Sequence, residues 1–89
     1  MQPKSLANLL RCLATQRRLE TLTLLLNSPT PLASSVIAAM LGVTDSTASF
    51  NLMALAGVGL VTRSQSGSYA FYSANRQLIQ EVFNFFNLK

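Results

Sequence analysis

The segment from Thr44 to Leu52 holds the side chains of this sequence that are best suited to recognising another molecule. Hydroxyl and amide groups cluster there, on Ser46, Thr47, Ser49 and Asn51. Such groups exchange hydrogen bonds with base edges in the major groove of DNA, where an asparagine can pair with adenine through two hydrogen bonds. The neighbouring Phe50 can contact a thymine methyl group. The segment therefore predicts DNA recognition with a preference for A/T base pairs.

These residue types also suit a structural role, and the sequence leaves both roles open. Serine and threonine in the first turn of a helix commonly cap its free N–H groups. Phe50 can pack against a neighbouring helix or form a protein-binding patch. No Lys or Arg lies between Arg18 and Arg63, so the segment carries no positive charge. This composition is the feature that favours protein binding as the alternative to DNA binding.

Small residues around the segment predict a helix-turn-helix. Ala38 lies four positions before Gly42, and Ala48 lies six positions after it. Helices that cross closely need small side chains at the contact, and a glycine can take the positive φ that ends the first helix. In a helix-turn-helix the second helix enters the DNA major groove. The spacing thus assigns the polar segment to a recognition helix.

Apolar periodicity predicts the helices that position this motif. Helices are expected over 5–14, 15–27 and 32–41. The second of these is expected to turn four leucines inward: Leu19, Leu22, Leu25 and Leu26. The recognition helix starts at a capping residue, Thr44 or Asp45, and is expected to reach Ala56 before Gly57 and Gly59 stop it. Its core-facing positions are Ala48, Leu52 and Leu55.

Downstream, the sequence predicts a β-hairpin and one more helix. Residues 60–64 and 69–73 are rich in residues that favour extended structure, and the polar residues 65–68 include the glycine of a tight turn. Asn75 can cap a last helix over 76–88. The predicted order is α-α-α-α-β-β-α, a mainly α winged helix-turn-helix with a small hairpin. We expect it to form one domain over residues 1–89.

Basic residues outside the recognition helix are further candidates for DNA contact. Arg63 precedes the hairpin tip, where it can meet a phosphate or the minor groove, and Gln65 and Ser66 follow it. A solvated strand charge is the alternative for Arg63. Arg18 stands at the start of a helix, where a cation opposes the helix dipole, and this favours a purpose beyond helix stability. Either Arg18 or Arg17 is expected to face phosphate while the other pairs with an acidic residue.

The composition indicates a basic protein with apolar surface to cover. Seven Lys and Arg against three Asp and Glu give a net charge of +4, which attracts polyanions such as DNA. Apolar residues make up 49% of the chain and charged residues only 11%. So few charged residues cannot cover the surface of a monomer. We therefore expect a homodimer that pairs the first and last helices. Its predicted interface residues are Leu6, Leu9, Leu10, Leu13, Ile79, Val82, Phe83 and Phe86.

Four parts of the sequence resemble, in order and spacing, the ArsR/SmtB family of dimeric winged-helix repressors. Residues 13–22, Leu-Ala-Thr-Gln-Arg-Arg-Leu-Glu-Thr-Leu, are similar to the segment that opens the family's second helix. Residues 41–49 and 52–61 are similar to the phrases that span its recognition helix, and Gly67 with Phe71-Tyr72 falls on wing positions. The resemblance covers residues 6–86. It implies a dimer paired through the first and last helices.

The sequence lacks the residues with which members of that family sense metals. The helix before the recognition helix has no Cys-x-Cys, the chain has no histidine, and the last helix offers one acid, Glu81. Cys12 is the single cysteine, so no intrachain disulfide can form. We expect no metal and no cofactor, and Cys12 is either a small buried apolar residue or a regulatory thiol. Neither paired acids nor a phosphate-binding glycine loop is present, so we do not expect an enzyme.

The sequence thus predicts a cytoplasmic homodimer that binds double-stranded DNA at a pseudo-palindromic site and represses by occluding a promoter. The apolar stretch Leu22 to Leu26 is too short to span a bilayer, so no membrane association is expected. The alternative is a winged-helix scaffold that binds a protein partner, with weak or no DNA binding. Salt dependence distinguishes the two, because phosphate contacts weaken steeply with salt.

Overall fold

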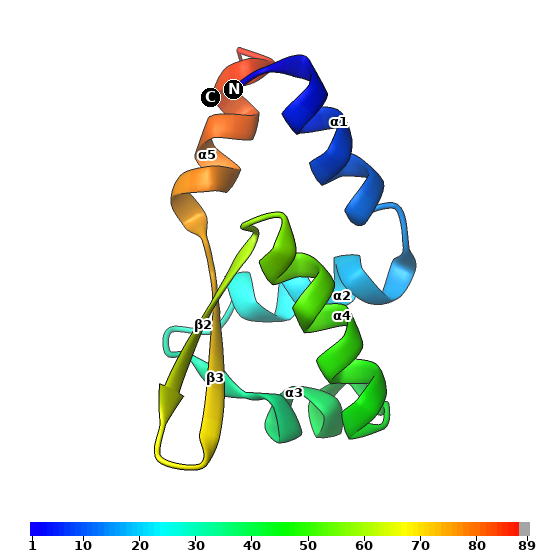
Figure 1. Cartoon of the computed structure of the whole chain (residues 1–89), viewed down its shortest axis with the longest axis vertical. Helices are drawn as coiled ribbons and strands as arrows, with labels where there is room; N and C mark the ends of the chain where they lie inside the picture. The colour runs from blue at the N-terminus through cyan, green and yellow to red at the C-terminus, as the bar shows by residue number, and fades with distance from the viewer. Residues whose placement is uncertain (88–89) are drawn as a thin grey trace.

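The computed structural model describes residues 1–87, which form helices and a three-stranded antiparallel sheet (Figure 1). The elements in chain order are α1 Pro3–Cys12, α2 Gln16–Leu26, β1 Leu32–Ala33, α3 Ser34–Leu41, α4 Asp45–Gly57, β2 Val61–Ser66, β3 Tyr69–Ala74 and α5 Arg76–Phe85. The strands lie in the order β1-β3-β2. The predicted winged helix-turn-helix is confirmed, with one strand, β1, added to it.

The turn between α3 and α4 has the geometry that its small residues predict. Gly42 adopts the left-handed conformation with φ 68° and ends α3. The two helices then cross at 112°. Ala38 and Ala48 are each only 1% exposed, as a close crossing requires. Leu52 and Leu55 follow Ala48 into the core, so the predicted inward face of α4 is confirmed.

Side-chain caps start α4 and α5 at the predicted positions. The Oγ1 atom of Thr44 accepts a hydrogen bond from the backbone N–H of Thr47 at 3.1 Å. The Oδ1 atom of Asn75 accepts from the backbone N–H of Leu78 at 3.1 Å. Each bond satisfies one of the N–H groups that a helix leaves free at its first turn. Thr44 rather than Asp45 is the cap of α4.

Asn75 also fastens α5 to the base of the hairpin. Its Nδ2 atom donates to the backbone carbonyl of Gly59 at 2.9 Å. Its backbone N–H donates to the carbonyl of Leu60 at 2.9 Å. The chain enters the hairpin at Leu60 and leaves it at Asn75, so these bonds join the two ends of the hairpin to the first turn of α5.

The strand β1 is the main difference from the predicted fold. The sequence predicts a helix over 32–41, but Leu32 pairs with Tyr72 and Ala33 with Phe71 along the edge of β3. Only Ser34–Leu41 is helical. A strand this short has no periodicity of its own. Its conformation is decided by the backbone groups of β3, which lie far away in the sequence.

The hairpin is longer and its loop shorter than predicted. Ser66 pairs with Tyr69, so Gln65 and Ser66 belong to β2, and the loop consists of Gly67 and Ser68. Gly67 has φ 61°, a positive value that a glycine adopts without steric cost. Two-residue loops with glycine in the first position match the twist of the flanking strands, which explains why the strands continue to the loop.

Three further positions differ from the prediction. Gly57 is the last residue of α4, and the chain reverses instead at Gly59, where φ is 83°. The helix α5 ends at Phe85, so residues 86 and 87 are not helical, contrary to the prediction, and residue 88 lies outside the described residues. Leu19, predicted to face inward, is 49% exposed, because it lines an apolar cavity that opens to solvent.

All elements pack around one apolar core. The buried core residues are Leu9, Cys12, Leu22, Leu25, Ile37, Leu52, Leu55, Leu60, Val61 and Tyr72. Along the long axis of 38 Å, the hairpin tip and the start of α4 lie at one end, and α1 and α5 project as two arms at the other (Figure 1). Within residues 1–87 no single helix is long and apolar enough to cross a membrane; α3 and α4 pass that test only as a pair, across their bend.

The two glycines of the helix-turn-helix give a matched test of this turn. Gly42→Ala is expected to lower the free energy of unfolding by about 1–2 kcal/mol, because an added Cβ disfavours a left-handed backbone. No atom lies within 4 Å of that Cβ, so the cost is conformational and not a clash. Gly57→Ala, in helical backbone with equally open space, is expected to raise it by about 0.5–1 kcal/mol. Urea denaturation measures both; equal stability of the two variants would contradict the role of Gly42.

Candidate nucleic-acid interface

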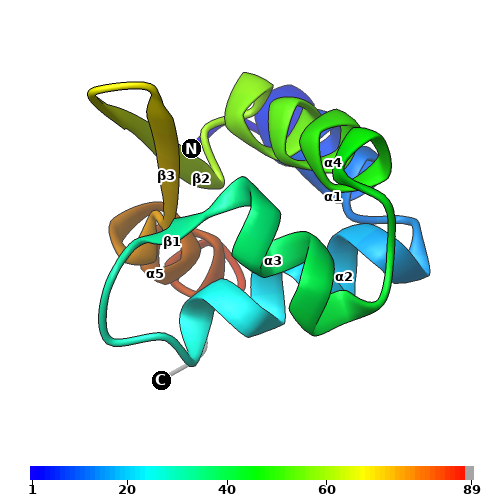
Figure 2. The same cartoon turned by 90° about the horizontal axis from the view of Figure 1, so that it is seen from below.

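The first half of α4 and the wing, residues 61–74, lie at the same end of the molecule. Figure 2 looks onto this end, where α3 and α4 cross in front and the wing stands beside them. The core-facing residues of α4 fix the rotation of this helix about its own axis. Its opposite side therefore faces solvent at the same end as the wing.

Beyond the exposed Asp45 in its first turn, the solvent-facing side of α4 is uncharged and largely apolar. We call Ser46, Phe50 and Met53 the reading face, because their helical spacing places them opposite the core residues. Phe50 is 67% exposed and Met53 69% exposed. Phe50 was predicted to be a contact residue, whereas Met53 was not. The sequence signal that could have identified Met53 is its position three residues after Phe50, on the face of the helix away from the core.

The predicted polar residues are placed unequally. Ser46 and Thr47 are exposed, whereas Ser49 and Asn51 are half-buried beside the reading face. Thr47 has a structural role as well, since its Oγ1 accepts a hydrogen bond from the Thr44 hydroxyl at 3.0 Å. The hydroxyl proton of Thr47 remains available to an external acceptor, because a hydroxyl both donates and accepts.

Arg18 lies between three elements and does not project freely from α2. Its Nη1 atom donates to the backbone carbonyl of Cys12, at the end of α1, at 3.2 Å. Its Nε atom donates to Oδ1 of Asn51, on α4, at 3.4 Å. The guanidinium carbon also lies 5.8 Å from the centre of the Phe50 ring, within the range of a cation–π contact. Arg18 thus connects α1 to the recognition helix.

The adjacent Arg17 has a different environment. Its Nη1 atom forms an ion pair with Oε1 of Glu20 at 3.3 Å, and both side chains are well exposed. Exposed pairs of this kind contribute little to stability. The prediction that one of the two arginines pairs with an acidic residue is confirmed for Arg17, whose partner is Glu20. No sequence signal identifies the contacts of Arg18, because its partners Cys12 and Asn51 are on separate elements.

The wing supplies an exposed cation at this end of the molecule. Arg63 is exposed on β2, and its Nη2 atom donates to Oε1 of Gln65 at 2.7 Å. The Nε2 atom of Gln65 in turn donates to the carbonyl of Gly67 at 3.2 Å, at the loop. Ser66 is exposed beside them. These bonds orient the Arg63 side chain along the wing towards its tip.

The described residues hold few side chains that bind metals, and Cys12 lies in the interior. Among residues 1–87 no group of three or more His, Cys, Asp and Glu side chains is arranged to hold a metal ion. Cys12 is buried, and its Sγ atom lies 3.5 Å from the carbonyl oxygen of Ala54, to which it donates. This is the environment expected for a small apolar residue.

The opposite end carries apolar side chains that the protomer leaves uncovered. None of the residues of α5, Arg76–Phe85, is buried. Phe83 is 45% exposed, Phe86 51% and Leu10 44%. Leu6 and Leu9, predicted for the same interface, are instead buried within the protomer, and they support α1 from inside. The remaining predicted interface residues, Leu13, Ile79 and Val82, are half-buried.

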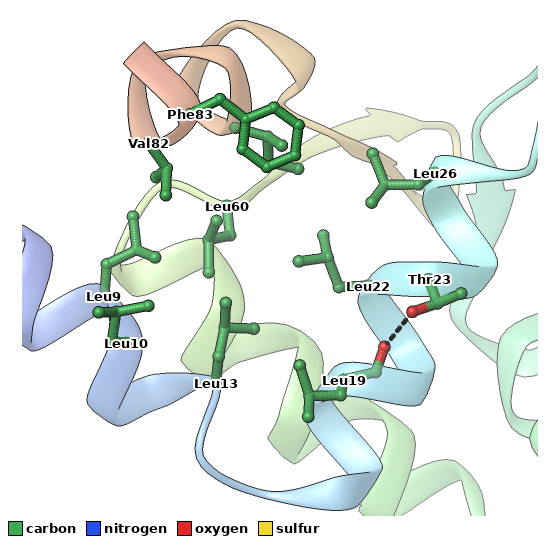
Figure 3. A pocket seen from close by; sticks show the side chains of 11 residues that line it. Leu9, Leu10, Leu13, Leu19, Leu22, Thr23, Leu26, Leu60, Val82 and Phe83 are labelled. Atoms are coloured by element: carbon green, nitrogen blue, oxygen red, sulfur yellow. Dashed lines mark hydrogen bonds between the residues drawn. The ribbon is translucent and has the colours of Figure 1, made fainter. Parts of the chain in front are cut away.

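An apolar cavity of about 270 Å³ lies between α1, α2 and α5 (Figure 3). The Phe83 ring of α5 points into it, and Leu10 and Leu19 form its rim. Thr23 is the one residue with a polar side chain in the lining, and its hydroxyl is already bonded to the Leu19 carbonyl at 2.7 Å. The lining therefore favours apolar contacts and gives no polar group that could orient a ligand.

Several solved structures are similar to this fold. The homodimeric winged helix-turn-helix DNA-binding domain of a possible ArsR-family transcriptional regulator from Mycobacterium bovis is 32% identical, with a TM-score of 0.78 over 92% of this chain and 74% of that one. An ArsR-like transcriptional regulator from Rhodococcus sp. is 26% identical, with a TM-score of 0.81 over 92% and 76%. The transcriptional regulator HlyU from Vibrio vulnificus is 26% identical, with a TM-score of 0.72 over 90% and 81%.

Comparisons by sequence add no further relatives. No protein-family model matches the chain, and no curated protein is similar to it in sequence.

The exposure of Phe50 predicts that it is dispensable for folding. Phe50→Ala is expected to lower the free energy of unfolding by less than about 1 kcal/mol, because it removes only an exposed ring and its contact with Arg18. Leu52→Ala, on the buried face of the same helix, is expected to cost about 2–5 kcal/mol. Thermal and urea denaturation give both values. A large loss of stability for Phe50→Ala would assign the ring to packing and remove it from the reading face.

Proposed function

This chain belongs to the ArsR family of winged-helix transcriptional regulators, and we propose that it is a homodimeric repressor that binds a pseudo-palindromic DNA site. Similar proteins of known structure are transcriptional regulators, one of them described as a DNA-binding domain, so the chain is a regulator and not an enzyme. The proposed site of action is the cytoplasm, where a bacterial-type operator is accessible. Repression would follow from occlusion of a promoter by the bound dimer.

The placement of two surfaces at opposite ends carries this proposal. The reading face and the wing lie at one end of the long axis, and the exposed apolar residues of α1 and α5 lie at the other. A two-fold dimer through α1 and α5 leaves both recognition helices free. Such a dimer presents them to two half-sites about one helical turn, roughly 34 Å, apart.

The proposed DNA contacts divide into reading and anchoring groups. Ser46, Ser49 and Asn51, with Phe50, would face base edges in the major groove, and Thr47 would support the start of the helix. Arg63 on the wing would meet the phosphate backbone, with Gln65 and Ser66 beside it. Since the recognition helix carries no cation, the charge-dependent share of affinity falls mainly on the wing. We therefore expect modest affinity that decreases with salt.

The proposed dimer also explains the open apolar cavity. Its rim residues Leu10, Leu19 and Phe83 are between 44% and 49% exposed, and they continue the apolar surface of α5. A partner protomer that covers this rim would remove apolar surface from water, at about 25 cal/mol for each Å². Leu19 thereby joins the proposed interface, although the sequence assigned it to the core.

A second candidate function is protein binding through the reading face. The exposure of Phe50 and Met53, at 67% and 69%, supports it, because exposed apolar side chains that lie together often mark interaction sites. Apolar contacts of this kind predict binding that changes little with salt. Selection of bound duplexes from a random DNA pool separates the two: an enriched inverted repeat supports the repressor, and no enrichment by a folded dimer supports protein binding.

Arg63→Ala tests the role of the wing. A dimer brings two copies of Arg63, so the slope of log K against log salt is expected to become shallower by about 1.8, at about 0.9 for each lost phosphate contact. Affinity is expected to fall alike for all DNA sequences, because phosphate contacts carry no base information. Fluorescence anisotropy titrations over a salt series measure both. An unchanged slope would remove Arg63 from the contact set.

Phe83→Asp tests the proposed interface. A carboxylate on this half-exposed apolar position is expected to give monomers or insoluble protein, because Phe83 lines an apolar cavity whose described lining has no free polar group to pair with it. Gln80→Asp places the same charge on an exposed polar position of α5 and is expected to remain dimeric. Leu19→Asp is expected to behave like Phe83→Asp. Light scattering gives the mass of each variant, and a well-folded Phe83→Asp dimer would refute this interface.

A further inference from the structure

We propose that Arg18 is a positioning residue that fixes the side-chain amide of Asn51, so that its NH₂ group donates to an A·T base pair whose thymine methyl group Phe50 contacts. This inference rests on the proposed DNA binding and adds to it the residue that sets specificity at one base pair. Arg18 itself would touch neither base nor phosphate.

The end of α1 holds the guanidinium group of Arg18 in place. The Cys12 carbonyl, which accepts from Nη1 at 3.2 Å, is among the last carbonyls of α1. The last carbonyls of a helix lack partners within the helix and carry partial negative charge. A guanidinium is therefore favoured there. This contact also offsets the cost of placing a cation in the first turn of α2.

The anchored guanidinium determines which way the Asn51 amide is oriented. Arg18 Nε–H points at Asn51 and can only donate, because a guanidinium has no acceptor. The amide must therefore turn its oxygen, Oδ1, towards Arg18, at 3.4 Å. The flipped amide would bring two donors together and is excluded. Its NH₂ group makes no hydrogen bond with other groups of the described chain and is available to an external acceptor.

An available NH₂ group restricts the bases that Asn51 can read. A two-bond contact with adenine uses Oδ1 as acceptor, and this oxygen keeps a second lone pair beside the bond from Arg18. The NH₂ donors match acceptors in the major groove, such as O4 of thymine or N7 and O6 of guanine. Thymine alone adds a methyl group on this edge, and Phe50 is the exposed apolar neighbour of Asn51. The two side chains together therefore favour an A·T base pair, with thymine at a fixed position on one strand.

Arg18→Lys separates the positioning role from a charge role. Lysine keeps the positive charge but lacks the planar fork that bonds the Cys12 carbonyl and Asn51 at the same time. Arg18→Gln removes the charge, and Arg17→Gln removes the same charge one residue away as the matched control. Asn51→Asp leaves Arg18 in place and removes both amide donors. This variant therefore tests base recognition by Asn51 even if an Arg18 variant is less stable.

The experiment measures affinity for the duplex that the wild-type dimer selects from a random pool and for its single-base variants, over a salt series. Wild type and Arg17→Gln are expected to prefer thymine at one position of each half-site by about tenfold. Arg18→Lys, Arg18→Gln and Asn51→Asp are expected to reduce this preference to about twofold or less. The salt slope of Arg18→Gln is expected to match that of the wild type. Thermal denaturation confirms that each variant is folded.

Three outcomes would overturn the inference. An unchanged thymine preference in both Arg18 variants would show that Asn51 does not depend on Arg18. A salt slope that becomes shallower by about 0.9 or more in Arg18→Gln, with base preference kept, would make Arg18 a phosphate contact. A wild-type dimer that enriches no sequence would overturn the proposed DNA binding itself, which separates failure of the function from failure of this inference.

Discussion

The close crossing of α3 and α4 is the contact on which the rest of the structure depends. Ala38 and Ala48 are almost fully buried at this crossing, and Gly42 supplies the left-handed turn that makes it possible. Larger side chains would separate the helices and rotate α4 away from the core. Because the buried positions of α4 fix its rotation, they also decide which residues form the reading face. The surface that meets a partner is thus determined by residues that never touch it.

The groups proposed to read bases and those proposed to anchor the backbone are separated on this molecule. The recognition helix offers hydroxyl, amide and apolar groups, and the exposed cation at that end, Arg63, is on the wing. Base edges specify sequence, whereas phosphate contacts position the protein on the duplex. With so little charge near the bases, selectivity depends on how firmly a few neutral side chains are oriented. The contact between Arg18 and Asn51 is one such orientation, and it comes from an element outside the helix-turn-helix.

Features with a local cause were predictable from the sequence, and features decided by distant partners were not. The left-handed Gly42 and the caps Thr44 and Asn75 depend on neighbours in the chain, and the structure confirms them. The strand β1 depends on an edge of β3. Likewise, helical periodicity placed Leu19 on the apolar side of α2 but could not show that α1 and α5 leave that side open. The partners of Arg18 are separated from it by loops and helices, so no spacing rule identifies them.

The fastening of α5 to the hairpin at Asn75 has a mechanical consequence. Two hydrogen bonds from Asn75, to Gly59 and Leu60, make the base of the wing and the first turn of α5 one rigid piece. In the proposed dimer α5 meets its symmetry mate, so the angle between the two α5 helices sets how far apart the wings reach along the duplex. The operator spacing that the protein accepts would then be adjusted by repacking phenylalanines at the far end of the molecule. Substitutions of those phenylalanines would change the operator spacing that the dimer accepts, without a change in any residue that faces DNA.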